Sequence, residues 1–239
     1  MAEIKVRNVS KDFLDASGKP FHALKDISFT WNKGENISFT GESGSGKSTS
    51  LRNFNEDEIG IFNVASKPLP FRKKLPTANN ANYRSIMKGL SAPKLKRYAI
   101  DDSQYLMTFE SFERVGEKGY EKFTQFALSF YSLIQFVIKN TPEDVIVYFL
   151  HHCEMSENGK IKAKTIGKML DTQLTLEGLF SIVLLCKTDG GKYYFETQSD
   201  GNTTAKSPID MFEKEIDNDL KFVDGTIREY WNLGGKIDE

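Results

Sequence analysis

Eight residues in the first quarter of the chain constrain its fold more than any other feature. They are Gly41, Glu42, Ser43, Gly44, Ser45, Gly46, Lys47 and Ser48. Their spacing satisfies the P-loop pattern, in which a glycine-rich turn aims successive backbone amides at phosphate oxygens. A strand is expected at residues 35–40 and a helix from residue 49, and the amino end of that helix would add a positive dipole. The alternative is a Gly/Ser turn without a ligand, and the flanking strand and helix argue against it.

The side chains of this pattern predict nucleotide chemistry. Lys47 would reach the β- and γ-phosphates of a nucleotide, and the Ser48 hydroxyl would ligate magnesium. The expected cofactors are therefore ATP and Mg²⁺. The expected nucleotide-binding residues are 41–48 together with Thr49.

A carboxylate for the magnesium ion is expected at the end of a neighbouring strand. Residues 98–101 are a predicted short strand that ends in Asp101 and is followed by Asp102. Asp101 is the expected magnesium ligand and Asp102 could orient the attacking water, although the sequence leaves the order of the two roles open. The alternative is that the pair caps a helix at residues 103–112.

Polar residues also follow the most apolar predicted strand, at residues 145–150. His152 is expected to touch the terminal phosphate and report hydrolysis to the next loop, with His151 and Glu154 as weaker candidates. Ordinary polarity at a strand end is the alternative. A zinc site is disfavoured, because consecutive residues cannot all face one metal ion.

The loop after these histidines is rich in lysine and is expected to bind the phosphates of a polyanion without reading its sequence. The candidate DNA-binding residues are Lys160, Lys162, Lys164 and Lys168. A solvated surface loop is the alternative.

Charge is distributed unevenly along the chain. The 32 Lys and Arg residues nearly balance 33 Asp and Glu residues, which leaves a formal net charge of -1. Residues 59–100 nevertheless carry nine bases and no acid, whereas residues 207–239 carry nine acids and four bases. One end of the molecule could therefore attract polyanions, unless the two sets of charges mix on the folded surface.

Composition excludes several classes of protein. With 39% hydrophobic and 27% charged residues, the chain is unlike disordered or collagen-like sequences. No apolar run approaches the roughly 18 residues of a membrane-spanning helix. The first ten residues are charged, unlike a signal peptide, and two cysteines are too few for a disulfide framework. We expect a cytoplasmic protein.

Strands and helices alternate along the chain, which favours a mostly parallel sheet covered by helices on both faces. Helices are expected at residues 83–90 and 120–139, and a further buried strand at residues 59–64. Residues 180–186 and 192–197 flank a Gly-Gly turn and predict a C-terminal antiparallel hairpin. The expected fold is one α/β domain of the P-loop NTPase class over residues 1–239.

Residues 3–50 resemble the opening of an ABC-transporter nucleotide-binding domain. The segments that carry this resemblance are residues 9–11, 23–28, 33–35 and 41–49. It implies that Phe13 stacks on adenine. The resemblance ends there, because no LSGGQ-like signature, Q-loop, D-loop or Asp-Glu end of a Walker B strand follows. Without a signature motif, the two-subunit ATP sandwich of that family cannot form in its usual way.

From residue 41 to about residue 233 the chain resembles small phage-encoded RecA-core ATPases, the Sak-type single-strand annealing proteins. The supporting segments are residues 41–53, 59–70, 100–107, 147–154, 164–170, 176–180 and 207–208. The resemblance implies a RecA-like core at residues 41–233, preceded by ABC-like strands at 1–40 and followed by a tail at 234–239. It also implies nucleotide binding at residues 41–48 with Asp101 or Asp102, a sensor at His152 and DNA contacts at residues 160–168.

This second resemblance implies an ATP-dependent single-stranded-DNA binder that promotes annealing or strand exchange in phage recombination. Such a protein would act in the cytoplasm of a bacterial host as a homo-oligomer, alongside a single-strand DNA-binding protein and without a membrane partner. One departure is that RecA cores usually carry a water-activating Glu after the second strand, whereas residues 64–71 contain no acid.

Three functional hypotheses follow. The main one is an ATPase that is stimulated by single-stranded DNA. The alternative is an ABC-type transport ATPase subunit, which requires a membrane partner. The third is a slow nucleotide-dependent switch that acts through a protein partner, and the missing Glu keeps it open.

Overall fold

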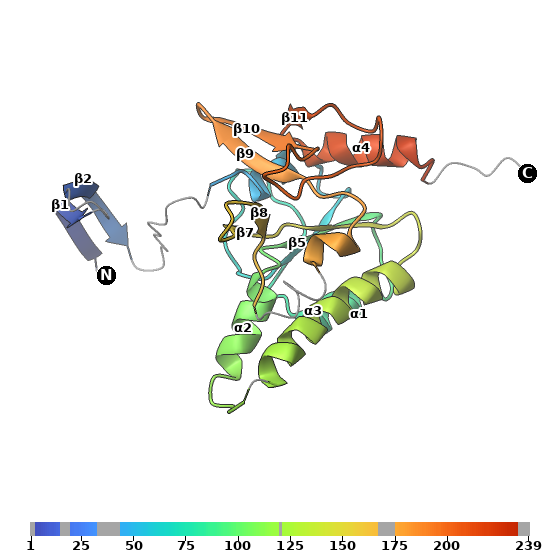
Figure 1. Cartoon of the computed structure of the whole chain (residues 1–239), viewed down its shortest axis with the longest axis horizontal. Coiled ribbons are helices and arrows are strands. Elements are labelled where there is room, and N and C mark those ends of the chain that lie inside the picture. Colours follow the sequence, from blue (N-terminus) through green and yellow to red (C-terminus); the bar gives the residue numbers. More distant parts are fainter. Residues whose placement is uncertain (1–2, 15–19, 33–43, 120, 167–174, 234–239) are drawn as a thin grey trace, which may run out of the picture. The chain divides into compact units, whose positions relative to one another are not determined.

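The computed structural model describes residues 3–14, 20–32, 44–119, 121–166 and 175–233 (Figure 1). They belong to two compact units, Met1–Ser43 and Gly44–Glu239. The expectation of one domain over the whole chain stays a prediction.

The first unit is an antiparallel pair of strands, β1 (Glu3–Leu14) and β2 (Pro20–Asn32). Their register runs from Glu3 opposite Asn32 to Leu14 opposite Pro20, with irregularities near Val9. The sequence itself predicts two shorter strands here, at residues 4–9 and 27–30, and the observed strands extend beyond both. The strand expected at residues 35–40 lies outside the described residues.

The centre of the second unit is a parallel four-stranded sheet. Its strands lie in the order β4 (Thr77–Asn79), β3 (Gly60–Asn63), β5 (Arg97–Asp101) and β6 (Ile146–Phe149). Each buried strand expected from the sequence is present within one residue of its expected bounds. Because the strands are parallel, their carboxyl ends share one edge, where Asn63 lies beside Asp101.

Helices cover both faces of this sheet (Figure 1). The helices are α1 (Tyr83–Leu90), α2 (Tyr105–Glu113) and α3 (Glu121–Asn140) on one face, and α4 (Leu220–Tyr230) on the other. Within the described part of the chain, no helix combines the length and apolarity needed to cross a membrane.

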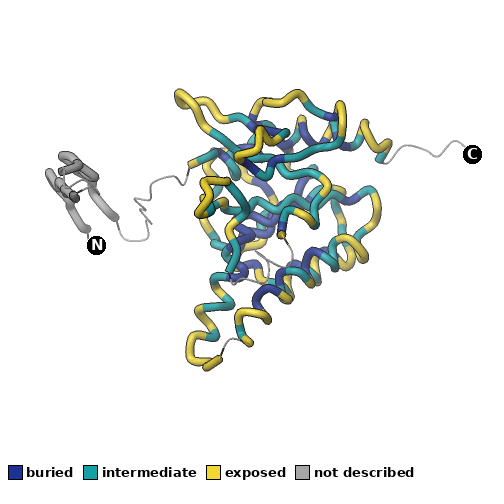
Figure 2. Tube along the Cα trace, viewed as in Figure 1, coloured by how far each residue is buried: buried dark blue, intermediate teal, exposed yellow. Residues whose placement is uncertain are grey.

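Two hydrophobic cores follow from the alternation of side chains along the strands. Phe62 and Ile100 pack with α1, α2 and α3, whereas Ile61 and Ala99 pack with α4. Successive side chains of a strand point to opposite faces, so a strand buried on both faces needs an unbroken apolar run. Figure 2 shows the buried positions concentrated where the sheet meets these helices. The expected α/β class is confirmed, and the arrangement is consistent with a P-loop NTPase fold.

A separate antiparallel sheet lies near α4 (Figure 1). Its order is β11 (Glu215–Asp217), β10 (Lys192–Glu196) and β9 (Leu185–Asp189). The expected C-terminal hairpin is therefore present, but its first strand begins at Leu185 rather than at residue 180. The preceding segment instead forms a single bridge between Val183 and Lys206.

The lysine-rich segment is a hairpin rather than an open loop. It contains β7 (Cys153–Met155) and β8 (Ile161–Ala163), which pair antiparallel. After the undescribed residues 167–174, a short 3₁₀-helix, η3 (Leu176–Leu179), packs against the α1–α3 core.

The helix expected after the glycine loop is a six-residue 3₁₀-helix, η1 (Ser48–Asn53), instead of the start of an α-helix. Two long-range contacts hold it: Arg52 donates to the Asn218 carbonyl at 2.5 Å, and Asn53 donates to Asp219 at 2.7 Å. Serine, threonine and asparagine are weak helix formers, so local propensity does not oppose these contacts. The dipole expected from an α-helix at this position is therefore not supported, because η1 is only six residues long. Binding of phosphate here would depend on the backbone amides and side chains of the loop.

Candidate functional site

The candidate site begins with a contact between the glycine loop and strand β5. The Ser48 hydroxyl donates to Asp101 Oδ1 at 2.8 Å, across 53 residues of sequence. Asp101 ends β5 and is 5% exposed. Burial raises the pKa of the Asp101 carboxyl, and the Ser48 hydrogen bond offsets only part of that rise. A cation placed here would favour the ionised carboxylate, so the pair suits a magnesium ion in both position and charge.

The described part of the loop, residues 44–48, is held by the β9–β10 hairpin. Gly46 has a φ of 87° and lies so close to Tyr193 that an added Cβ would approach the ring to 2.7 Å. Cys186 Sγ lies 2.5 Å from the Ser45 carbonyl oxygen. A glycine is therefore required at position 46 both by backbone conformation and by space. The sequence carries no signal that Tyr193 and Cys186 would contact this loop, because both are more than a hundred residues away.

The structure describes only some of the other residues predicted to bind the nucleotide. Lys47 Nζ lies 3.4 Å from Ser45 Oγ, and the Lys47 charge acts on Asp101. Thr49 lies within η1, where its carbonyl accepts from Arg52 at 3.1 Å. Gly41, Glu42 and Ser43 lie outside the described residues.

Asp102 has different partners from its neighbour. Its Oδ1 lies 2.9 Å from His152 Nε2, and its Oδ2 lies 2.5 Å from Lys67 Nζ. Burial alone would raise the pKa of Asp102, but the hydrogen bonds from His152 and Lys67 hold it below its ordinary value. Asp102 also has a φ of 59°, a left-handed conformation that is uncommon outside glycine.

The two carboxylates do not cap the following helix, which is the alternative role expected for them. Helix α2 has Gln104 as its N-cap residue, and no side chain caps it. Both Asp101 and Asp102 are instead at least nine-tenths buried at the carboxyl edge of the sheet. Burying a carboxylate is costly unless it has partners, and here Ser48 donates to Asp101 while His152 and Lys67 contact Asp102.

The histidines after β6 connect this edge to the lysine hairpin. His152 contacts Asp102, as described, and its carbonyl accepts from the Lys164 amide at 2.8 Å. His151 bonds to Ser103 Oγ through Nδ1 at 2.9 Å and to the Lys164 carbonyl through Nε2 at 2.7 Å. A carbonyl can only accept, so Nε2 carries a proton. Burial lowers the pKa of His151 to about 4, and this ring is neutral at pH 7.

The predicted DNA-binding lysines are only partly free of acidic partners. Lys162 lies 3.4 Å from Glu154 across the β7–β8 hairpin, so part of its charge is neutralised. Lys160 and Lys164 are exposed, and Lys168 lies outside the described residues. The hairpin therefore presents less positive charge than the sequence suggests.

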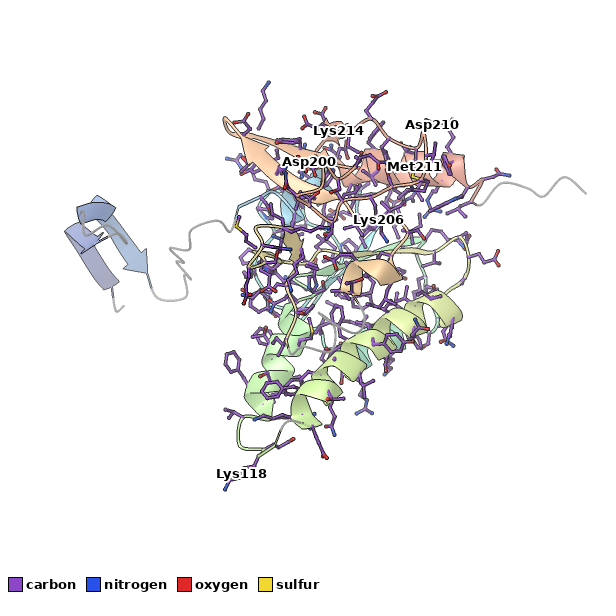
Figure 3. The ribbon with its side chains drawn as sticks, viewed as in Figure 1. Lys118, Asp200, Lys206, Asp210, Met211 and Lys214 are labelled. Carbon is purple, nitrogen blue, oxygen red and sulfur yellow. The ribbon has the colours of Figure 1, made fainter. Side chains whose placement is uncertain are left out.

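The unopposed bases of residues 59–100 also meet acids in the folded chain. Three ion pairs link them to other segments: Lys67 with Asp102, Lys96 with Asp144, and Arg97 with Asp224. In the part of the second unit that contains the β9–β11 sheet, the charge of Lys214 acts on Asp200, and both residues are labelled in Figure 3. Folding therefore mixes much of the charge that is segregated along the sequence.

Comparison with known proteins supports the nucleotide-binding interpretation. The family model described as ABC transporter matches residues 24–74. A probable amino-acid ABC transporter ATP-binding protein of Haemophilus influenzae is 39% identical over 89 residues, which are 35% of this chain and 33% of that protein. The phosphonates import ATP-binding protein PhnC of Fusobacterium nucleatum is 34% identical over 104 residues, 44% of this chain and 38% of that protein. No solved structure gives a significant match.

The chain thus spans between a third and two fifths of the length of these curated relatives. The matches support a P-loop ATPase of the ABC type, a family that uses ATP with Mg²⁺, which agrees with the cofactors expected from the sequence. The family match includes the glycine loop and ends before β5, so Asp101, Asp102 and His152 lie beyond it. The resemblance to phage annealing proteins stays a prediction.

Proposed function

We propose that the chain binds Mg-ATP at residues 44–48 and Asp101 and hydrolyses it. The observation that carries this proposal is the 2.8 Å hydrogen bond between Ser48 and Asp101. It joins the hydroxyl and the carboxylate that would share a magnesium ion in a P-loop enzyme. Ser48 and Asp101 would hold the magnesium ion, which would supply positive charge against the negative phosphates of the nucleotide. Lys47 would supply a second positive charge to the same phosphates.

Asp102, held by His152, would orient the attacking water molecule rather than bind the metal ion. Asp102 is ionised and already accepts two hydrogen bonds, so one of its oxygens can accept from a water molecule when a donor leaves. His152 holds the other oxygen in place. This assignment gives Asp101 to the metal and Asp102 to the water, and it rests on their different partners.

The names of the two relatives favour one class of partner for this ATPase. Both are ATP-binding proteins of import or transport systems, so we propose a membrane component as the first partner to test. The family model matches residues 24–74, and the sequence lacks an LSGGQ-like signature. A partner would therefore have to be engaged through a different surface from that of the usual two-subunit sandwich.

The nucleotide site is tested by binding of ATP and ADP with and without Mg²⁺, followed by ATP turnover. Asp101→Asn and Ser48→Ala should abolish the gain in affinity that Mg²⁺ gives, and should lower turnover by about 100-fold or more. Asp144→Asn is the matched control, because it removes a carboxylate paired with Lys96 near the opposite edge of the sheet. Equal Mg²⁺ dependence in all variants, or no nucleotide binding by the natural chain, would show the proposal to be wrong.

Single-stranded DNA is the second candidate partner, and one observation favours it. The lysine hairpin is joined to the candidate site through the His152 carbonyl and the Lys164 amide, so the end of β6 and the exposed lysines are connected directly. ATP turnover should then rise with single-stranded DNA at low salt, and the rise should disappear in a Lys160→Ala and Lys164→Ala double variant. No effect of DNA, together with recovery of a membrane protein on purification, would favour the transport interpretation.

A further inference from the structure

Lys67 is a cation at the candidate site that the chemistry above does not use. It follows β3 in a turn that is bonded at several points. Asn63 donates to the Lys67 carbonyl at 2.6 Å, and the Ser66 hydroxyl bonds to Asn80 at 2.9 Å. Ser66 has a φ of 56°, a left-handed backbone conformation that is uncommon for residues other than glycine. The backbone of Lys67 is thereby fixed beside the carboxyl ends of β3 and β5.

The ammonium group of Lys67 is held at this edge yet remains accessible. It lies 2.5 Å from Asp102 Oδ2 and 5.2 Å from the centre of the Tyr105 ring. The Lys67 side chain is 53% exposed, whereas that of Asp102 is 8% exposed. The charge of Lys67 also acts on Asp101, the carboxylate bonded to Ser48. A phosphate bound beside Ser48 and Asp101 would therefore lie close to the Lys67 charge, which already acts on Asp101.

Asp102 can release Lys67 without losing all of its partners. His152 Nε2 stays within 2.9 Å of the other carboxylate oxygen, so the buried charge remains hydrogen-bonded. A terminal phosphate carries more negative charge than a carboxylate and offers more acceptor oxygens, so it competes well for an ammonium group. Lys67 has a long flexible side chain and needs only a change of rotamer to move between two nearby acceptors.

We propose that Lys67 is a specificity-determining residue that contacts the terminal phosphate of bound ATP, and that Asp102 holds it when that phosphate is absent. The inference rests on the proposed function, since it requires a nucleotide at this site. Transfer of the ammonium group frees one oxygen of Asp102 at the moment when a triphosphate is in place. Recognition of ATP and exposure of the water-orienting carboxylate are then a single event.

The experiment compares affinities for Mg-ADP and for a non-hydrolysable Mg-ATP analogue. Lys67→Met should lower affinity for the analogue by about 10- to 100-fold, the effect of losing one charge-assisted hydrogen bond, with little change for ADP. Lys67→Arg should restore much of the preference for the analogue. Lys96→Met is the matched control, because Lys96 is 58% exposed and lies 2.5 Å from Asp144, away from the site. It should leave both affinities unchanged.

A second variant tests the exchange of partners. Asp102→Asn removes the charge that holds Lys67, so preference for the analogue over ADP should be retained or should increase. If Asp102→Asn weakens that preference as Lys67→Met does, the two residues act as a fixed structural pair and the exchange is wrong. Equal losses for ADP and analogue in Lys67→Met would also overturn it. Failure of the natural chain to bind either nucleotide would instead refute the proposed function itself.

Discussion

Replacing Asp224 with asparagine should destabilise the second unit more than any other single loss of charge on α4. Asp224 is 1% exposed and accepts from Arg97 at 2.5 Å, Arg228 at 2.9 Å and Tyr148 at 2.8 Å. The contacts with Arg97 and Tyr148 tie α4 to the strands β5 and β6, whereas Arg228 lies on α4 itself. Asparagine keeps the shape of the side chain and an acceptor for Tyr148, but it leaves two guanidinium groups facing a neutral amide.

The size of the loss follows from how far the two arginines can be hydrated. Breaking a fully buried ion pair by removing one partner costs about 3–5 kcal/mol. The Arg97 side chain is 28% exposed and that of Arg228 is 15% exposed, so water can compensate part of the loss. We expect the free energy of unfolding to fall by about 2–4 kcal/mol.

The assay is urea unfolding at neutral pH, with Glu58→Gln as the control. Glu58 also binds α4, through Lys221 at 2.8 Å, but the two side chains are 26% and 41% exposed. An exposed pair of this kind contributes less than about 1 kcal/mol. The reasoning is refuted if Asp224→Asn costs no more than Glu58→Gln, because the buried charge would then not be what attaches α4.

Two further predictions concern the edges of the site. Burial lowers the pKa of His151 from 6.5 to about 4, so as the pH falls the unfolded chain takes up a proton on this ring before the folded chain does. The contribution of neutral His151 to the free energy of unfolding should be fully present above about pH 6.5. It should be lost as the pH falls to about 4, by up to about 3 kcal/mol. His151→Gln should flatten this part of the profile of unfolding free energy against pH, and an unchanged slope would contradict the assignment. Gly46→Ala should weaken nucleotide binding, because its Cβ would meet Tyr193 at 2.7 Å and its φ of 87° is strained for alanine. A Gly46→Ala and Tyr193→Ser double variant should recover part of the affinity, and no recovery would show that the ring is not the obstacle.

The parts of this structure that sequence predicts are those specified by local pattern. The strands β3, β5 and β6 are short apolar runs, of which β3 ends in Asn63 and β5 in Asp101, and their carboxyl ends meet at one edge because the sheet is parallel. Asp101 is thereby placed at this edge, and the requirement of a P-loop for a carboxylate near its magnesium ion predicts its approach to Ser48. The amphipathic spacing of α3 likewise gave its bounds nearly in full.

The parts that sequence does not predict depend on contacts between distant segments. Nothing local to Gly46 indicates that Tyr193 packs on it, and nothing near Lys67 indicates that Asp102 is its partner. An α-helix is expected at η1 because helices follow P-loops, but its residues are weak helix formers, and hydrogen bonds from Arg52 and Asn53 to the segment before α4 accompany a 3₁₀-helix. Long-range hydrogen bonds of this kind can override weak local preferences.

The left-handed backbone at Asp102 restricts which acids the position can accept. With a φ of 59°, it suits glycine, asparagine and aspartate, whose short side chains tolerate this conformation, and it disfavours glutamate. A saturation library at codon 102, sorted for folded protein before any selection for activity, should therefore be enriched in those three residues. A change from aspartate to glutamate at this position would first require a different backbone conformation at the end of β5. The main chain therefore restricts the length of the side chain that can orient the water molecule.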